Sequence, residues 1–398
     1  MERHSRPAIG LTLIAAGLIS LLVAPQEASA IPAFARQYGL SCSQCHTVWP
    51  ALNSFGRKFK EAGYTTVRGE PEGQTKIDDA LSLPTSFPFA AIVKSRPYDK
   101  RRGQDAKLRV LQELELFIAG NFSRYGSVFA ELELEDEADY APELAGTFGL
   151  HPHQLFNVIA GKAPTLAADP YDTLSNMRRI TRNRRLVLNQ AWSAGARVDD
   201  DVPMIAIYGR DTKVDRVFWA ASYSADVGDP EGEGPNDFTG RLVVDLATDV
   251  SIGGFVMSGA QDRTVDKTTK ELDYSRYGFD LQARYKNFNA LAAYLRGRDD
   301  IFKGGRETNN SWYTEVYYTI TRDVLQRGSF PGFMLVPIVR FDRYERNNGL
   351  AGYSDLTANL SYLPWENVKA FLEVTRAIDR PTPGPKDWRV VGQFVLAF

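Results

Sequence analysis

Residues Asp355–Tyr362 read DLTANLSY, in which polar and apolar residues alternate along the whole stretch. The side chains of a β-strand point alternately to its two faces, so this stretch would form a strand with one polar and one apolar face. The same alternation occurs at 277–285 and at 312–318, with aromatic residues near the segment ends. Aromatic residues at strand ends are typical of strands that cross a membrane. The pattern therefore predicts strands with one face against an apolar environment.

Alternating segments continue from Phe87 to the last residue, and we count about sixteen of them. An even number of strands closes a barrel with both chain ends on one side. The pairs Thr248–Asp249, Lys286–Asn287 and Glu366–Asn367 have the length of tight turns, and longer stretches lie between them. The sequence therefore predicts an all-β transmembrane barrel over residues 85–398. We expect its strands to start near residues 86, 108, 126, 153, 187, 203, 214, 237, 250, 274, 288, 309, 332, 352, 368 and 387.

The alternation is interrupted between Pro164 and Pro203. The count of segments places the fifth strand near residue 187, within this stretch. The long connection is then expected on the periplasmic side, together with the tight turns.

The C-terminal stretch Trp388–Phe398 also alternates and ends on an aromatic residue. Such an end resembles the recognition signal of outer-membrane barrel proteins. A periplasmic β-sandwich or solenoid would alternate too, but its strands are usually shorter and its outer faces polar. We therefore expect a barrel in contact with the outer-membrane lipid of a bacterium of the Gram-negative type.

The N-terminus has the pattern of an exported protein. Residues 1–7 are basic, residues 8–24 are mainly apolar, and Ala28-Ser29-Ala30 is a small-residue cleavage site. This is the pattern of a secretory signal peptide, so residues 1–30 are expected to be removed before Ile31. An uncleaved membrane anchor is the alternative, but its apolar core would be short for a spanning helix.

The stretch Cys42–His46 reads CSQCH and contains both cysteines of the chain. In the C-x-x-C-H motif, two thiols three residues apart reach the two vinyl groups of one porphyrin, and the histidine binds the iron. The motif therefore predicts one covalent haem c on Cys42 and Cys45, with His46 as the proximal ligand. A disulfide across so short a loop is a poor alternative.

Residues 31–84 form the segment that carries this motif, between helices expected near 33–38 and 52–62. Leu52, Phe55 and Phe59 fall on one face of the second helix and could pack against haem or form ordinary core. A segment of roughly fifty residues is too small to enclose a haem alone. A barrel of about sixteen strands has a lumen that can hold a plug. We therefore expect the haem segment in the barrel mouth.

No second iron ligand lies near the motif, because residues 31–100 contain no methionine and no histidine other than His46. Histidine would lower the haem potential, methionine would raise it, and an open site would bind small ligands. His151, His153 and Met334 are the preferred distal candidates. For each of them, a loop histidine or a packing methionine is the ordinary alternative. The remaining candidates are Met177, Met204 and Met257.

Four glutamates alternate on two neighbouring strands and should crowd one part of the lumen wall. Carboxylates are ligands for hard cations, so one interpretation is a transient path for Fe²⁺ toward the haem, with Asp136 and Asp139 above it. The other is a charge ladder in which inward arginines pair with these acids, as polar lumen walls usually do. We favour the ladder. The glutamates are Glu113, Glu115, Glu131 and Glu133, and the arginines are Arg241, Arg284, Arg340 and Arg389.

The densest basic run is Met177–Arg185, within the anomalous connection. It could neutralise haem propionates or bind an acidic periplasmic electron acceptor, and a solvated loop is the ordinary alternative. The whole chain is nearly balanced, with 47 basic and 49 acidic residues, so nucleic acid is not an expected partner. No phosphate-binding glycine loop or Ser-His-Asp arrangement is apparent, so neither nucleotide nor hydrolase chemistry is supported.

Three N-terminal stretches together resemble the head of the fused monohaem cytochrome-porins of the bacterial outer membrane. They are Pro32–Gly39, the motif Cys42–His46, and Pro50–Lys60 followed by Gly63-Tyr64. The best-known members of this family oxidise ferrous iron. The resemblance covers about thirty residues in detail, and the barrel agrees in length and architecture.

The resemblance implies an electron-transfer protein, and possible Fe(II)-oxidising oxidoreductase, that takes electrons from extracellular Fe(II) for a periplasmic electron-carrier protein. The hydrocarbon layer is roughly 25 to 30 Å thick, so a haem held within a barrel would shorten the distance that electrons must cross. Two alternatives stay open. One is a porin in which the haem holds a structural plug, and the other is an outward conduit to an external acceptor.

Overall fold

The computed structural model describes residues 32–68, 73–77, 82–85, 88–189, 197–225, 235–321, 334–381 and 387–398. The predicted signal peptide, residues 1–30, lies outside these ranges. None of the helices in the described ranges is long and apolar enough to span a membrane.

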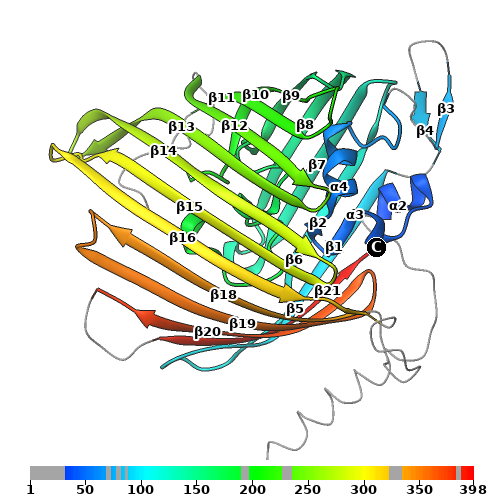
Figure 1. The fold of residues 1–398 in the computed structure, drawn as a ribbon. Coiled ribbons are helices and arrows are strands. Elements are labelled where there is room, and N and C mark those ends of the chain that lie inside the picture. Colours follow the sequence, from blue (N-terminus) through cyan, green and yellow to red (C-terminus); the bar gives the residue numbers. More distant parts are fainter. Residues whose placement is uncertain are drawn as a thin grey trace, which may run out of the picture.

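Sixteen antiparallel strands form a closed barrel (Figure 1), which confirms the predicted fold class. The last strand pairs with the first, and Phe398 and Ala91 exchange backbone hydrogen bonds of 2.8 and 2.9 Å. The two-residue β17 (Ile320–Thr321) extends the row of β16 along β18. The strands are β5 (Phe89–Arg101), β6 (Lys107–Asn121), β7 (Gly126–Glu135), β8 (Pro142–His153), β9 (Phe156–Pro164), β10 (Asp201–Arg210), β11 (Val217–Ala225), β12 (Pro235–Ala247), β13 (Val250–Val265), β14 (Thr268–Tyr285), β15 (Phe288–Asp300), β16 (Arg306–Tyr318), β18 (Met334–Arg346), β19 (Ala351–Trp365), β20 (Val368–Asp379) and β21 (Trp388–Ala397).

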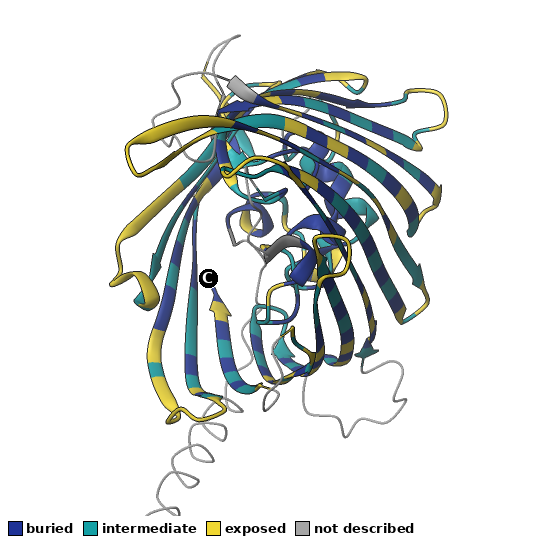
Figure 2. Cartoon of the chain, turned by 90° about the vertical axis from the view of Figure 1, so that its left-hand side faces the viewer, coloured by how far each residue is buried: buried dark blue, intermediate teal, exposed yellow. Residues whose placement is uncertain are grey.

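The strands turn their apolar side chains outward. In β19, Thr357, Asn359 and Ser361 are buried, whereas Leu356 and Leu360 are 39 and 48 % exposed. Figure 2 shows the same alternation of buried and exposed residues along most strands. This is the reverse of a soluble protein and the arrangement that a lipid-facing barrel requires.

One expected strand position is wrong, and one strand was not expected. The stretch near residue 187 is a helical turn, α5 (Leu186–Asn189), and the missed strand is β8. The sequence of β8, PELAGTFGLHPH, contains glycines and prolines that weaken a strand pattern. The apolar run at 186–188 looks like a strand but lies inside the barrel.

Because β8 was not predicted, the sequence also assigns the long connection to the wrong end of the barrel. The tight turns at 248–249, 286–287 and 366–367 join β12 to β13, β14 to β15 and β19 to β20 at one end, here called the turn end. Because hairpins alternate between the two ends, the connection from β9 to β10 leaves from the opposite end, the loop end. The expectation that it lies with the tight turns is therefore wrong.

This connection folds into the barrel and is called the inner loop, residues 165–189 and 197–200. Leu174, Ile180 and Val187 are at most 2 % exposed. Tyr313 of β16 donates a 2.7 Å hydrogen bond to the Thr173 carbonyl, and the backbone N–H of Leu186 donates to Asp342 of β18 at 3.1 Å. Figure 2 looks into the barrel from the loop end and shows coil segments within the ring of strands.

The N-terminal segment lies at the turn end, next to the C-terminus (Figure 1). The helix expected near 33–38 is present, and the one expected near 52–62 begins two residues later than predicted. Asn53 caps this second helix by accepting a 2.9 Å hydrogen bond from the N–H of Gly56. The elements are α2 (Pro32–Tyr38), α3 (Cys42–Cys45), β1 (His46–Val48), β2 (Ala51–Leu52), α4 (Ser54–Glu61), β3 (Gln74–Lys76) and β4 (Ser82–Pro84).

Candidate functional site

The two cysteines occupy the single helical turn α3, and both thiols are free. The side chain of Asn53 donates to the carbonyls of Ser43 and Gln44 at 3.2 and 2.9 Å. Gly56 of α4 lies so close to α3 that a Cβ there would be 2.2 Å from the Cys45 carbonyl oxygen. Asn53 and Gly56 therefore hold the cysteine turn against α4.

His46 follows this turn, and its surroundings indicate which ring nitrogen carries the proton. Nδ1 lies 3.1 Å from the Pro50 carbonyl, where an N–H can donate. That tautomer leaves the lone pair on Nε2, the arrangement that iron-binding histidines use. Burial disfavours the imidazolium and lowers the pKa of His46 to about 4. His46 is therefore a neutral potential ligand.

The surroundings of the motif fit a c-type haem. Both thiols are protonated, because burial raises the pKa of Cys45 to about 11 and that of Cys42 further. Phe55 and Phe59, predicted to share a face, are partly and fully buried beside the motif. They also line a cavity of about 300 Å³ between α4 and the turn end of β10. Two thiols, a neutral histidine and an aromatic face are the groups that covalent haem requires.

The N-terminal segment is anchored to the barrel and to the inner loop. Arg210 of β10 makes a bidentate pair with Glu61 of α4 at 2.7 and 2.9 Å. The N–H of Leu52 donates to Asp172 of the inner loop at 3.2 Å. Tyr64 stacks on Phe129 of β7 with ring centroids 6.2 Å apart. The segment therefore packs against the inner loop and two parts of the wall.

The three preferred distal candidates lie in different places. His151 is buried, with Nε2 2.7 Å from the Ser127 hydroxyl and Nδ1 2.8 Å from the Tyr208 hydroxyl. His153 is exposed at the end of β8, where its Nδ1 accepts from the N–H of Leu155 at 3.1 Å. Met334 is 5 % exposed and belongs to the apolar cluster that includes Val48 and Ala51.

Both nitrogens of His151 therefore already have partners, and the Nδ1 of His153 accepts a bond within its own turn. Among the three preferred candidates in the described ranges, Met334 shares an apolar cluster with Val48 and Ala51 near His46, and Met257 belongs to the same cluster. Of the other candidates, Met204 and Met257 are buried in the wall and Met177 is half exposed.

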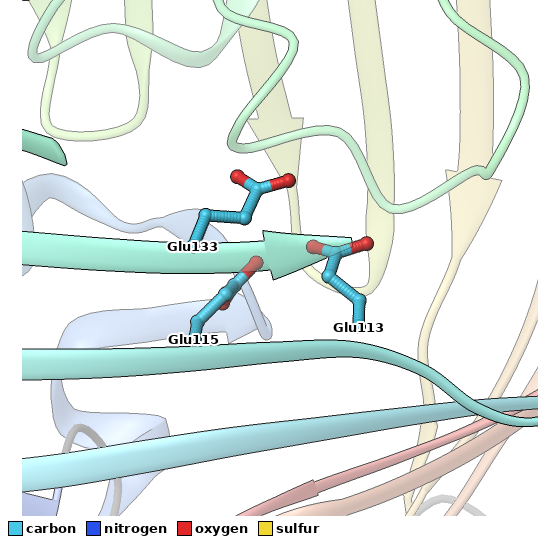
Figure 3. Close-up of side chains that lie close together, drawn as sticks. All are labelled: Glu113, Glu115 and Glu133. Carbon is cyan, nitrogen blue, oxygen red and sulfur yellow. The ribbon is translucent and has the colours of Figure 1, made fainter. Parts of the chain in front are cut away.

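The four predicted glutamates do gather on the lumen wall. Glu113, Glu115 and Glu131 are at most 8 % exposed. Glu115 and Glu133 face each other in the register of β6 and β7. Glu113, Glu115 and Glu133 offer carboxylate oxygens within 4.8 Å of one another (Figure 3).

The positive charge beside these glutamates is small. Lys94 of β5 contacts the carboxylates of Glu113 and Glu115. Gln112 donates through Nε2 to Glu113 at 3.1 Å and to Glu135 at 2.7 Å. Among the described residues, Glu131 and Glu133 have neither a hydrogen bond nor an ion pair.

The predicted arginine partners are engaged elsewhere. Arg241 pairs with Asp280 at 2.6 Å, Arg340 with Asp342 at 2.7 Å and Arg389 with Asp99 at 2.8 Å. Arg284 donates to a turn carbonyl, and Asp136 pairs with Arg109. The charge ladder therefore exists on the rest of the wall, but within the described ranges its arginines do not reach the four glutamates.

The basic run Met177–Arg185 lies in the inner loop, where Ile180, Thr181 and Arg185 are buried and Met177 and Arg184 are exposed. Arg185 donates to the carbonyls of Asp172 and Ser175 at 2.6 and 2.9 Å. The N–H groups of Arg182 and Asn183 donate to Glu373 of β20. Its interpretations as a solvated loop and as a periplasmic docking surface are therefore wrong. The positive charge of Arg178 contributes to the lowered pKa of His46, after the larger effect of burial.

Several residues that matter to these sites were not predicted. Lys94 could have been found, since it lies on the inward face of β5 opposite Glu113. Ser127 and Tyr208, which bind His151, come from β7 and β10 and carry no local signal. Asp172 likewise carries no local sequence signal, because its contacts depend on the inner loop entering the barrel.

Neither a family model nor a curated relative matches this sequence. Solved porin structures do match. The anion-selective porin from Comamonas acidovorans aligns with a TM-score of 0.57 at 13 % identity, over 78 % of this chain and 98 % of that one. OmpF of Salmonella typhi, solved with daunomycin, gives 0.58 at 11 % identity over 82 % and 100 %. Outer-membrane expressed OmpT of Vibrio cholerae gives 0.52 at 10 % identity over 82 % and 100 %.

The architecture defines the class: this is a porin-type β-barrel, with an inner loop and an N-terminal segment packed against it. At such low identities the likeness establishes the fold alone.

Proposed function

We propose that the protein is an electron-transfer protein of the bacterial outer membrane. One c-type haem would be attached to Cys42 and Cys45, with His46 as its proximal ligand. The observation that carries the proposal is the geometry of His46, whose Nδ1 lies 3.1 Å from the Pro50 carbonyl beside two free thiols. The likeness to outer-membrane porins supports the location.

When bound, such a haem supplies a centre that accepts and releases one electron. The chain contributes its position: Asn53 and Gly56 fix the cysteine turn, and the Glu61–Arg210 pair fixes α4 in the barrel. Extracellular Fe(II) is the proposed donor and would leave as Fe(III). A periplasmic electron-carrier protein is the proposed acceptor of that electron. The insulating hydrocarbon, roughly 25 to 30 Å thick, explains why the centre would sit within a barrel.

A channel function is the second candidate, because the barrel aligns with solved porins. In that case the haem would mainly hold the N-terminal segment as a plug, and solutes would pass beside it. The inner loop and the haem segment both lie within the barrel and would restrict such passage. An outward conduit would use the same residues with electrons moving in the opposite direction.

The test is to purify the protein with haem, add Fe(II) without oxygen, and follow the reduced α-band in the visible spectrum. We expect covalent haem and rapid reduction, and a C42A/C45A variant should lack both. Absence of covalent haem would sink the haem proposal. Haem that Fe(II) does not reduce, together with solute uptake into liposomes, would favour the channel.

The distal ligand is tested by spectra of single variants. M334L should change the spin state or the potential if Met334 binds the iron, whereas a packing methionine tolerates this replacement. The same measurement on H151Q tests the buried histidine, with H153Q as the exposed comparison. Three unchanged spectra would exclude all three residues as ligands.

A further inference from the structure

We propose that Glu113, Glu115, Glu131 and Glu133 form a binding site for a hard divalent cation in the barrel lumen. Carboxylate oxygens are the ligands that such cations prefer, and several carboxylates around one point provide both charge and coordination. The residues come from two adjacent strands and therefore need no long-range rearrangement to act together.

The geometry is close to that of a coordination sphere. Oxygens of Glu113, Glu115 and Glu133 lie within 4.8 Å of one another. Oxygens that share one divalent cation lie about 3 to 4 Å apart, given metal–oxygen distances of about 2.0 to 2.6 Å. Small side-chain rotations would close this gap. Figure 3 shows the three carboxylates converging from β6 and β7.

Two further groups point to a missing positive partner. Glu131 is 5 % exposed, lies in the inward row of Glu133, and has no hydrogen bond or ion pair with any described residue. The Oε1 atom of Gln112 is also buried without a partner, while the Nε2 of the same amide donates to Glu113. The Gln112 Oε1 atom is a buried acceptor without a donor, which is costly, so a ligand that satisfies it is favoured.

Lys94 supplies only part of the required charge. Its ammonium contacts one oxygen, Oε1, of Glu113 and of Glu115. Glu131 and Glu133 have no ion pair with any described residue. Lys94 would repel the proposed cation and keep its binding reversible, because like charges at short range weaken each other's binding.

The site adjoins the haem segment. The inward row of β7 runs from Phe129, which stacks on Tyr64, through Glu131 and Glu133 toward the loop end. Lys60 of α4 lies 6.0 Å from the centre of the Phe129 ring. Resting on the proposed function, the cation would be Fe(II), held between the outer side of the barrel and the haem segment.

Binding is tested with Mn²⁺ as the probe, because the electron paramagnetic resonance signal of free Mn²⁺ falls on binding. We expect the purified full chain to bind one Mn²⁺ with micromolar to millimolar affinity. E131Q/E133Q should bind at least tenfold more weakly, and K94Q severalfold more tightly. The matched control is E271Q, because Glu271 is an exposed glutamate of β14.

Absence of Mn²⁺ binding at millimolar concentration would overturn the site, as would equal affinity in E131Q/E133Q and the unmodified protein. The C42A/C45A variant separates this site from the haem. It should bind Mn²⁺ as the unmodified protein does, and a loss of binding there would overturn a site built by the four glutamates. If Mn²⁺ binds but Fe(II) does not reduce the haem, the cation site stands and the proposed electron transfer fails.

Discussion

Two parts of the lumen wall treat buried charge differently. The acidic wall consists of the four glutamates of β6 and β7, with Lys94 paired to Glu113 and Glu115. The paired wall, on β12 to β18, matches buried arginines with buried acids. Its pairs are Arg241–Asp280, Arg276–Asp299 and Arg340–Asp342.

Both walls bury charge, but only the paired wall neutralises it. A charge removed from water is costly unless a partner compensates it. Each buried charge of the paired wall is compensated by its ion-pair partner, so a structural role is sufficient to explain these pairs. On the acidic wall, Lys94 compensates only part of the charge, at Glu113 and Glu115, and the proposed cation would compensate the rest.

The largest expected effect comes from breaking the paired wall. Replacing Arg241 by Met leaves Asp280 buried with only the Thr173 hydroxyl. We expect a loss of about 3 to 5 kcal/mol in the free energy of unfolding, measured by urea unfolding in detergent micelles. The matched control is R306M, whose pair with Asp300 is largely exposed. A loss below about 1 kcal/mol for R241M would contradict the view that the buried pairs of the paired wall stabilise the barrel more than exposed pairs do.

Asp172 provides a test that depends on pH. This inner-loop acid accepts only neutral donors, from Leu52 and Gln282 at 3.2 Å. Burial raises its pKa from 3.8 to about 7. The folded protein therefore holds this proton more tightly than the unfolded chain, and stability should fall as the pH rises from about 4 to about 7.

Replacing Asp172 by Asn removes the titrating group and keeps an acceptor for one donor. We expect a gain on the order of 2 kcal/mol above pH 7 that shrinks toward pH 4, followed by urea unfolding at several pH values. A gain that does not vary with pH would contradict the raised pKa.

On the acidic wall, neutralisation should stabilise. Glu133 lies opposite Glu115, and like charges in directly opposed positions destabilise a sheet. E133Q should therefore raise the free energy of unfolding by about 0.5 to 1 kcal/mol without divalent cations. The gain should vanish when Mn²⁺ is added, since only the unmodified protein then profits from the ligand. A loss of stability in E133Q would show that the charge of Glu133 is compensated in the folded protein, as the charges of the paired wall are.

The smallest effect is expected at the exposed link between the N-terminal segment and the barrel. Lys58 of α4 pairs with Asp215, and each side chain is 43 % exposed. D215N should change the free energy of unfolding by less than about 1 kcal/mol, because water screens such a pair. A larger loss would show that an ion pair near the barrel mouth contributes as much to the free energy of unfolding as a pair within the barrel.

Local patterns predicted the features that depend on neighbouring residues. The alternation in β19 and the shared face of Glu113 and Glu115 follow from the strand period alone. The helical turn at 186–189 could not be distinguished from a strand, because a short apolar run fits both. Its burial depends on the inner loop entering the barrel, which no local pattern encodes.

The candidate sites divide in the same way. The spacing of Cys42, Cys45 and His46 is a local signal, and so is the Asn53 cap of the next helix. The hydrogen bonds of both His151 ring nitrogens depend on Ser127 and Tyr208, which lie on other strands. Such partners become visible only when the strand order and the register are known.

The burial of the cysteines has a consequence for the order of events during biogenesis. Cys42 is 4 % exposed within a segment that is pinned to the finished barrel. Burial also keeps both thiols protonated and therefore poorly reactive. On the proposed function, an enzyme that attaches haem would need access to these thiols, so attachment would have to precede folding. The chain would then receive its haem while unfolded, and only afterwards would the barrel close by the pairing of β21 with β5.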